Sequence, residues 1–294
     1  MLNIKNSLRV IILFCLVVSF TCFSDDISTK NTSFLPTDAK HASWVFLGMV
    51  ESESGDVYDY FFQVERNDKD FHATVALFDV QTKNIVFQED SSTKIDEPDN
   101  YKWEIGRVFL RFSKITNNWI FGIKNQNKTG FNFKVGMLDS ADNHPVTKKL
   151  QNGTSFFVSQ VGQLNGNIKG DTDEQFVTAK SVWFRQIWFS SNSVDEQING
   201  LLCTFNDGRG MYSMNVMADE ELQDSTAGYY DATGLASTIS QFIKTDKINN
   251  ESWMIQVSIP KMNLELSDNF KNNHLIAGFL SNNDQGFCLL NLVG

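Results

Sequence analysis

The chain has 294 residues, of which 41% are hydrophobic and 13% aromatic, and its formal net charge is −10 at pH 7. This is the composition of a globular protein with enough apolar material for one large core or two smaller ones. The acidic balance and the lack of Lys/Arg runs in the mature chain argue against a nucleic-acid partner. The 25 phenylalanines favour sheets, or an apolar cavity, over a helical bundle.

The first 24 residues have the pattern of a secretory signal peptide. Lys5 and Arg9 form a positive start, and residues 10–20 are almost wholly apolar. This run is too short for a comfortable transmembrane helix and no other stretch qualifies, so we expect no transmembrane span in the mature chain. We predict a secreted or periplasmic protein with a polar leader at residues 25–40. Lipid attachment at Cys22, or retention of the segment as an anchor, are the alternatives.

After the leader, the chain alternates apolar and polar residues with the period of two that is typical of β-strands. Residues 58–65 and 131–137 are clear examples, and turn signals separate such runs. About sixteen short strands of this kind predict an all-β protein. A loop-like stretch near the middle of the chain suggests a boundary, which gives two β domains at 41–165 and 166–294.

The segment Trp183–Trp188, Trp-Phe-Arg-Gln-Ile-Trp, lies in a long strand-like run that is apolar on both faces. A strand of this kind is buried on both faces, so Arg185 in its middle is unfavourable unless it is paired. Two interpretations stay open. The stem of Arg185 could cover apolar neighbours while its head is exposed. Alternatively, the guanidinium could bind a carboxylate or phosphate head group beside Trp183 or Trp188.

Three aspartates and one histidine are further candidates for chemistry. Asp207 lies in the Asn-Asp-Gly-Arg-Gly segment of residues 206–210, where a hairpin turn by itself explains it. His72 and Asp79 lie near opposite ends of a predicted strand and so cannot contact each other. Asp79, Asp207 and Asp231 would each need burial beside aromatic side chains to act as acids. The four histidines are widely separated, so we predict no metal site, and no cofactor motif is present.

Cys203 and Cys288 are the two cysteines that follow the signal segment, and both lie in strand-like segments. In an oxidising compartment they could form a disulfide. They could equally remain two separate buried thiols, because pairing depends on a distance that the sequence does not contain.

Five segments, taken in order, resemble the AttH / carotenoid 1,2-hydratase (hydroxyneurosporene synthase) family, whose members have two lipocalin-like β domains. The resemblance covers the chain from about Trp44 to Gly294. The matching segments are residues 43–48 with 58–66 (the family's "Glu-Trp-Trp-Tyr" opening block), 71–79 ("His-x-Ala-Leu-Thr-Asp"), 181–190 ("Trp-Met-Asp-(Arg/His)-Glu-(Trp/Phe)"), 202–212 ("Leu-x-Asp-Gly-Arg-x-Met"), and Trp253 with 286–294.

The resemblance implies two tandem lipocalin-like β-barrels after the signal segment. Together with the aromatic content, it predicts a small hydrophobic ligand, a lipid or an isoprenoid-like molecule. Whether the aromatic side chains fill the barrels or line a cavity stays open. The residues that we expect to contact the ligand are Trp44, His72, Trp183, Arg185 and Trp188.

The departures from the family pattern bear on activity. The family's central Asp aligns with Arg185 and its Glu aligns with Ile187. Hydration of an isolated double bond needs a strong proton donor, and Arg cannot serve because it stays protonated. We therefore expect ligand binding without catalysis. The alternatives are a hydro-lyase or isomerase that uses a relocated acid, and a non-catalytic interaction protein of the cell envelope.

Overall fold

The structure, a computed structural model, describes residues 39–98, 101–124, 129–137, 146–150, 153–161, 163–170, 173–189, 197–219, 221–239, 243–272, 274–281 and 285–293. The predicted signal peptide and nearly all of the polar leader lie outside these residues. Thr37–Gly294 forms one compact unit. All the secondary-structure elements of the described residues are β-strands, which confirms the all-β prediction.

The first sheet contains twelve strands in the described part of the chain. They are β1 (His41–Ser52), β2 (Val57–Asn67), β3 (Asp70–Asp79), β4 (Ile85–Lys94), β5 (Lys102–Ile105), β6 (Val108–Ser113), β7 (Asn118–Ile123), β8 (Gly130–Gly136), β9 (Val146–Lys149), β10 (Ser155–Gln160), β11 (Gln163–Lys169) and β12 (Glu174–Phe189).

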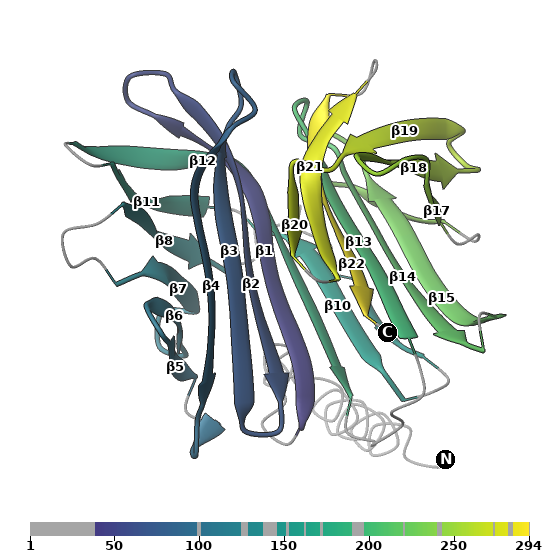
Figure 1. Cartoon of the computed structure of the whole chain (residues 1–294), viewed down its shortest axis with the longest axis horizontal. Helices are drawn as coiled ribbons and strands as arrows, with labels where there is room; N and C mark the ends of the chain where they lie inside the picture. The colour runs from purple at the N-terminus through teal and green to yellow at the C-terminus, as the bar shows by residue number, and fades with distance from the viewer. Residues whose placement is uncertain are drawn as a thin grey trace, which may run out of the picture. The chain divides into compact units, whose positions relative to one another are not determined.

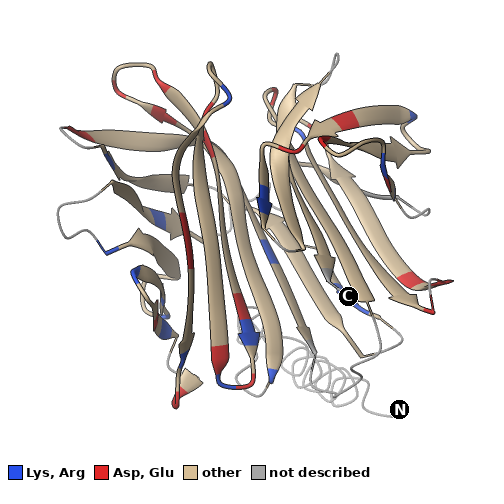
Figure 2. Cartoon of the chain, in the orientation of Figure 1, with Lys and Arg blue, Asp and Glu red and all other residues tan. Residues whose placement is uncertain are grey.

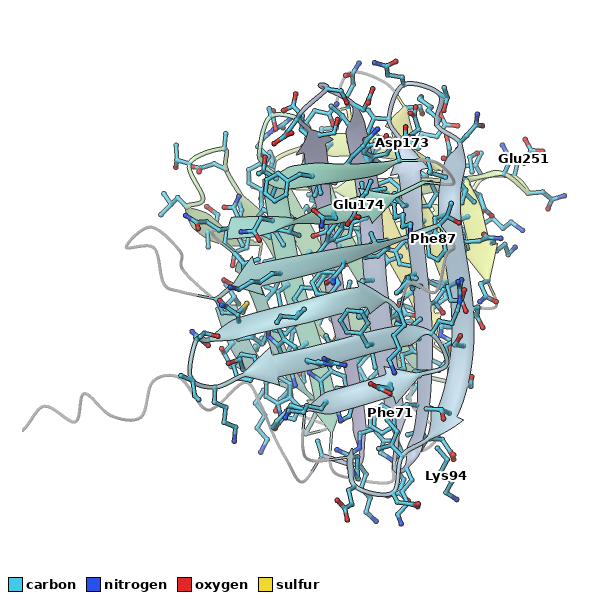
Figure 3. The ribbon with its side chains drawn as sticks, turned by 90° about the vertical axis from the view of Figure 1, so that its left-hand side faces the viewer. Phe71, Phe87, Lys94, Asp173, Glu174 and Glu251 are labelled. Carbon is cyan, nitrogen blue, oxygen red and sulfur yellow. A yellow bond between two sulfur atoms is a disulfide. The ribbon has the colours of Figure 1, made fainter. Side chains whose placement is uncertain are left out.

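These twelve strands curl into a nearly closed barrel (Figure 1). Their hydrogen-bonded order is β4-β3-β2-β1-β12-β11-β8-β7-β6-β5, and β10 pairs with both β12 and β9. The two ends of this order meet where Arg107, in the turn after β5, forms an ion pair with Glu89 of β4. Figure 3 shows β5 to β8 crossing in front of the long strands, with Lys94 at one end of the barrel and Asp173 and Glu174 at the other.

The second sheet has ten strands in the described residues and forms an open half-barrel. They are β13 (Gln197–Phe205), β14 (Gly210–Ala218), β15 (Glu221–Tyr230), β16 (Ala236–Ile239), β17 (Lys244–Lys247), β18 (Ser252–Val257), β19 (Met262–Ser267), β20 (Phe270–Asn272), β21 (Leu275–Ser281) and β22 (Gly286–Val293). The order is β16-β15-β14-β13-β22-β21-β19-β18-β17, and β20 pairs with β21.

The chain passes from the first sheet to the second between β12 and β13, after Phe189 and before Gln197. The boundary predicted between residues 165 and 166 instead falls inside β11 of the first sheet. Gly166 is part of that strand, and a Cβ atom there would lie 2.0 Å from the Asn132 carbonyl oxygen of β8. The glycine therefore allows close approach of two backbones and does not mark a linker.

Aromatic rings fill much of the interior of the first barrel. The Phe46 ring centroid lies 4.4 Å from that of Phe121 and 4.8 Å from that of Phe184. Trp44 packs in the same interior, 4.6 Å from Trp103. Rings at these separations make favourable ring–ring contacts. The phenylalanine-rich pattern thus reflects packing in this part of the barrel.

A second apolar layer lies between the two sheets. Val45, Phe61 and Trp183 of the first sheet belong to one core cluster with Leu202 and Tyr212 of the second. Period-two alternation explains both layers, because odd and even residues of β1, β2 and β12 point to opposite faces of the sheet. Both faces of these strands are therefore covered, one by the barrel interior and one by the second sheet.

Charged residues of both signs are dispersed over the strands and turns (Figure 2). This distribution agrees with the interspersed charges of the sequence and shows no strongly basic region in the described residues. Within that same part of the chain, no helix is long and apolar enough to cross a membrane.

Candidate functional site

A pocket of about 600 Å³ opens between the two sheets. It lies toward the end of the first barrel where β4 ends, the end at which Figure 3 labels Phe71 and Lys94. Most residues of its wall are polar or charged, and Ala42, Phe71, Ile187 and Ile198 supply apolar side chains. The lining residues are His41, Ala42, Ser43, Glu65, Arg66, Asn67, Asp70, Phe71, His72, Ser92, Thr93, Ile187, Ile198, Gly200, His274 and Asn291.

Strand register explains how the first sheet supplies its share of this wall. Ile187, Ser43, Glu65, His72 and Ser92 are successive cross-strand partners along β12, β1, β2, β3 and β4. Cross-strand partners point to the same face, so this row presents all five side chains to the pocket. The second sheet supplies Gly200 and Asn291, which are partners in β13 and β22.

Glu65 is the centre of a hydrogen-bond network in the pocket wall. Its Oε1 accepts from Gln63 Nε2 at 2.5 Å and from Asn291 Nδ2 at 3.5 Å, and it lies 3.4 Å from Nε2 of His274. Burial acts to raise the pKa of Glu65, but the hydrogen bond and charge of His274, together with Asn291 and His72, bring it below its ordinary value. The hydrogen bond to Glu65 raises the pKa of His274. The pair therefore favours a carboxylate beside an imidazolium.

His72 lines the pocket, and both nitrogens of its ring lie within hydrogen-bond distance of neighbouring side chains. Nε2 lies 3.0 Å from Thr74 Oγ1 and 3.1 Å from Asp90 Oδ2, while Nδ1 lies 3.1 Å from Ser92 Oγ. Asp90 Oδ2 also accepts from Thr74 and from Asn272 of the second sheet. These bonds orient the imidazole at the pocket mouth and connect the two sheets.

Arg185 is fully buried, with none of its surface exposed. The interpretation in which its head group is exposed is therefore wrong, because the second sheet covers this face of β12. Burial lowers the pKa of Arg185 to about 10, and the charge of Glu65 opposes that shift. The guanidinium is thus charged at neutral pH. Its Nε, Nη1 and Nη2 have no hydrogen-bond partner among the described residues.

The predicted tryptophans lie outside the pocket wall. Trp183 is buried between the sheets, with its ring centroid 4.7 Å from that of Tyr230. Trp44 is buried inside the first barrel against Trp103. Trp188 is partly exposed, and strand alternation places it on the face of β12 opposite to Arg185. None of the three is among the residues that line the pocket.

The three candidate aspartates organise turns. Asp79 Oδ1 accepts from the backbone of Thr82 at 2.6 Å. Asp207 accepts from Arg209 in the β13–β14 turn, at 2.6 Å from its Nε. Asp231 Oδ1 accepts from the backbone amides of Thr233 and Leu235, and hydrogen bonds keep the pKa of Asp231 below its usual value. None of them lines the pocket, so the structure does not support them as relocated acids.

Sequence reasoning missed Glu65, His274 and the buried Asp59. Asp59 and Glu65 share one face of β2 with Phe61 and Gln63, and a face with polar residues at three of four positions is typical of the solvent side of a sheet. His274 is isolated in the sequence from every other histidine. No group of three or more His, Cys, Asp or Glu side chains in the described residues is placed to hold a metal ion.

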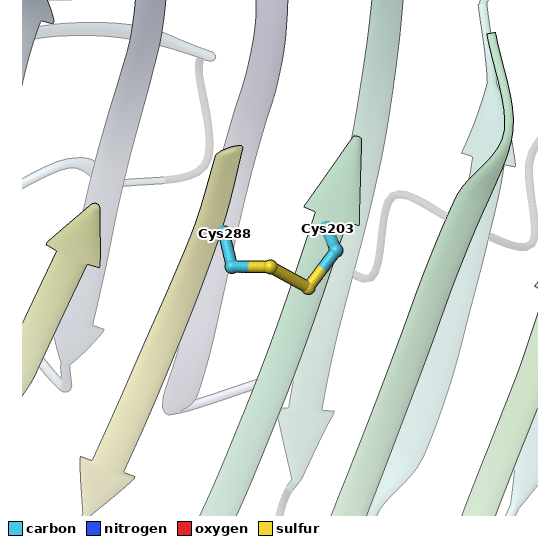
Figure 4. Close-up of a disulfide and its surroundings, with 2 residues drawn as sticks. All are labelled: Cys203 and Cys288. Atoms are coloured by element: carbon cyan, nitrogen blue, oxygen red, sulfur yellow. A yellow bond between two sulfur atoms is a disulfide. The ribbon is translucent and has the colours of Figure 1, made fainter. Parts of the chain in front are cut away.

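Cys203 and Cys288 form a disulfide between β13 and β22 (Figure 4). The two residues are direct cross-strand partners, and their Cα atoms are 4.1 Å apart. Both sulfurs belong to the apolar cluster on the face of the second sheet that points away from the first. The bond therefore ties together two central strands of the half-barrel, one of which carries Gly200 and the other Asn291.

Comparison with solved structures finds proteins of the same fold. One is a protein described as an AttH from Nitrosomonas europaea, with a TM-score of 0.65 and 11% sequence identity over 90% of this chain and 96% of that one. Another is kievitone hydratase from Nectria haematococca, with a TM-score of 0.64 and 9% identity over 90% and 94% of the two chains. No family model and no curated protein sequence matches the chain. The chain therefore shares its tandem lipocalin-like β architecture with these proteins, as the sequence resemblance to the AttH family predicted.

Proposed function

We propose that the protein binds a small, largely apolar molecule in the pocket between its two sheets. The pocket itself carries this proposal. Its volume of about 600 Å³ is in the range of small-molecule sites, which are concave, mostly apolar and contain few polar groups. Phe71, Ile187 and Ile198 supply apolar surface. The polar groups include Glu65, His274 and Asn291, together with Arg66, Asp70 and His72.

The resemblance to the AttH family supports the same location. The two positions at which the family has acids correspond to Arg185 and Ile187. Ile187 lines the pocket, and Arg185 lies in the next row of the sheet. Replacement of two acids by an apolar residue and a permanently charged one favours binding without proton transfer at these positions.

The proposal places the protein outside the cytoplasm, in the periplasm or the medium. The signal-like first 24 residues motivate this location. The Cys203–Cys288 disulfide supports it, because such bonds persist mainly in oxidising compartments. Detection of the mature protein in a periplasmic or culture fraction, with a new N-terminus near residue 25, is the expected result.

Binding can be tested with the neutral fluorescent probe N-phenyl-1-naphthylamine. We expect the probe to bind the wild-type protein. Ile198→Trp places a larger side chain in the pocket and should weaken binding by about tenfold or more, because the ring fills space that the probe needs. The matched control is Leu235→Trp, since Leu235 is 55% exposed and lies outside the pocket. Lack of probe binding by the wild type, or equal affinities of the two variants, would refute the proposal.

A second candidate function is a hydro-lyase reaction, and the Glu65–His274 pair is the observation that favours it. One solved structure of the same fold bears the name of a hydratase. In this chain, the lowered pKa of Glu65 and the raised pKa of His274 suit a carboxylate base beside an imidazolium acid. Such a pair suits an activated substrate better than an isolated double bond, which needs a stronger acid.

Deuterium exchange tests the second candidate. The molecule that co-purifies with the protein would be incubated with it in D₂O and extracted, and its deuterium content would be measured by mass spectrometry. Enzyme-dependent incorporation that is lost in Glu65→Gln would support a hydro-lyase, because the amide keeps the shape of the side chain but cannot accept the proton. Incorporation equal to that without protein would exclude this reaction for that molecule.

A further inference from the structure

Arg185 carries a buried charge to which the described residues give no hydrogen bond. A buried charge is strongly unfavourable unless it is paired and hydrogen-bonded. Arg185 is 0% exposed, yet its three guanidinium nitrogens have no hydrogen-bond partner in the described residues. The neighbouring carboxylate, Glu65, already interacts with Gln63, Asn291 and His274.

Strand register places Arg185 directly behind the pocket wall, although Arg185 itself is not among the lining residues. Ile187, Ser43 and Glu65 form the row that lines the pocket. The next row that points to the same face of the sheet contains Arg185 and Val45. Arg185 is therefore only two residues along β12 from Ile187 of the pocket wall.

A glycine of the second sheet leaves room for the guanidinium. Gly200 lines the pocket, and a Cβ atom on it would lie 2.7 Å from Arg185 Nη1. The guanidinium therefore occupies the space that a side chain at position 200 would need, and the glycine is the wall residue next to it. The acceptor Oδ1 of Asn291, the cross-strand partner of Gly200, also has no hydrogen-bond partner in the described residues.

The charged groups around the pocket have both signs. Glu65 and His274 form a pair at 3.4 Å, and Arg66 and Asp70 also line the pocket. Arg185 is a buried cation behind this wall that makes no hydrogen bond within the described residues. A planar guanidinium binds a carboxylate through two parallel hydrogen bonds, which matches both the charge and the number of free donors.

We propose that the ligand of this pocket is a carboxylate-bearing amphiphile whose carboxylate binds Arg185, and whose apolar part lies against Ile187, Ile198 and Phe71. This inference rests on the proposed function, because it assumes that the pocket holds an apolar molecule. It adds the chemical class of the ligand, of which a medium-chain fatty acid is the simplest example.

The experiment compares laurate with its uncharged methyl ester as competitors of N-phenyl-1-naphthylamine. The wild type should bind laurate at least about tenfold more tightly than methyl laurate. Arg185→Met should lose this preference while its affinity for methyl laurate stays within about twofold, because only the charge and the donors are removed. Arg185→Lys should keep a reduced preference for laurate, since the ammonium retains the charge but cannot form the two parallel hydrogen bonds of a guanidinium. The matched control is Arg111→Met, because Arg111 is a half-exposed arginine that pairs with Glu104 on β5.

The outcomes separate the two proposals. If the neutral probe does not bind, the proposed function fails and this inference fails with it. If the probe binds but laurate and its ester compete equally in the wild type, only the inference fails. A preference that persists in Arg185→Met would show that Arg185 has a purely structural role. Should the Met variant not fold, Arg185→Lys decides, since a preference as strong as that of the wild type would show that the carboxylate does not bind the guanidinium.

Discussion

Asp59 provides a sharp test of the layer between the sheets. It lies in β2, is 1% exposed, and faces Met49 and Phe78 across the neighbouring strands. Its Oδ1 has no hydrogen-bond partner among the described residues. Burial raises the pKa of Asp59 to about 8. The folded protein therefore holds this carboxyl in its protonated form at neutral pH.

The sign and size of the effect on stability follow from proton linkage. The unfolded chain binds the same proton with a pKa of about 3.9. The folded protein binds the Asp59 proton more tightly than the unfolded chain does, and this difference stabilises the folded state. The stabilisation is fully present below about pH 4 and is lost as the pH rises through about 8. A difference of about four pKa units corresponds to about 5 kcal/mol. Asp59→Asn removes the ionisation and with it this loss.

Urea unfolding, followed by tryptophan fluorescence without reductant, measures the effect. We expect the free energy of unfolding of Asp59→Asn, minus that of the wild type, to increase by several kcal/mol between pH 5 and pH 9. Asp173→Asn, on an exposed position, controls for the change in net charge. A difference between Asp59→Asn and the wild type that is constant over this range would refute the burial of a protonated Asp59.

Three further predictions concern the second sheet and its contact with the first. Cys203→Ser, which breaks the bond to Cys288 across a separation of 85 residues, should lower the free energy of unfolding by about 4 kcal/mol in urea titrations. Gly210→Ala should lower it by about 1–3 kcal/mol or more, because the new Cβ would lie 2.1 Å from the Trp183 ring. Asp231→Asn should leave the Kd for the neutral probe unchanged and lower only the thermal midpoint, since this side chain accepts hydrogen bonds within a turn.

Each of these predictions has a control or a contrary outcome. Addition of reductant should destabilise the wild type to the level of Cys203→Ser, and an unchanged midpoint would show that the bond is not formed. Gly136→Ala is the matched glycine control, because the nearest atom to its new Cβ would be 3.4 Å away. If the Asp231→Asn variant is fully folded but does not bind the probe, Asp231 becomes a candidate site residue again.

Local patterns in the sequence were sufficient for the strands, several turns and the general architecture. Alternation over residues 58–65 correctly predicted β2, and Asn-Asp-Gly at 206–208 correctly predicted the β13–β14 turn, in which Gly208 has φ 89°. These features depend on the period of two and on the φ preferences of glycine, both of which are local. The sequence left two interpretations of Arg185 open, one exposed and one buried, because the sheet that covers this residue is placed only by the tertiary structure.

The amino-acid sequence by itself determined that this is an all-β, aromatic-rich chain, because those properties follow from residue-by-residue alternation and composition, while the two tandem barrel-like units were implied by the family resemblance. The tertiary structure decided where the site lies. It placed the row of Ile187, Ser43 and Glu65 opposite Gly200 and His274, and it moved the pocket from the aromatic barrel interior to the layer between the sheets. The physical reason is that a polar strand face is equally compatible with water and with a polar cleft, and only contacts between distant segments distinguish the two.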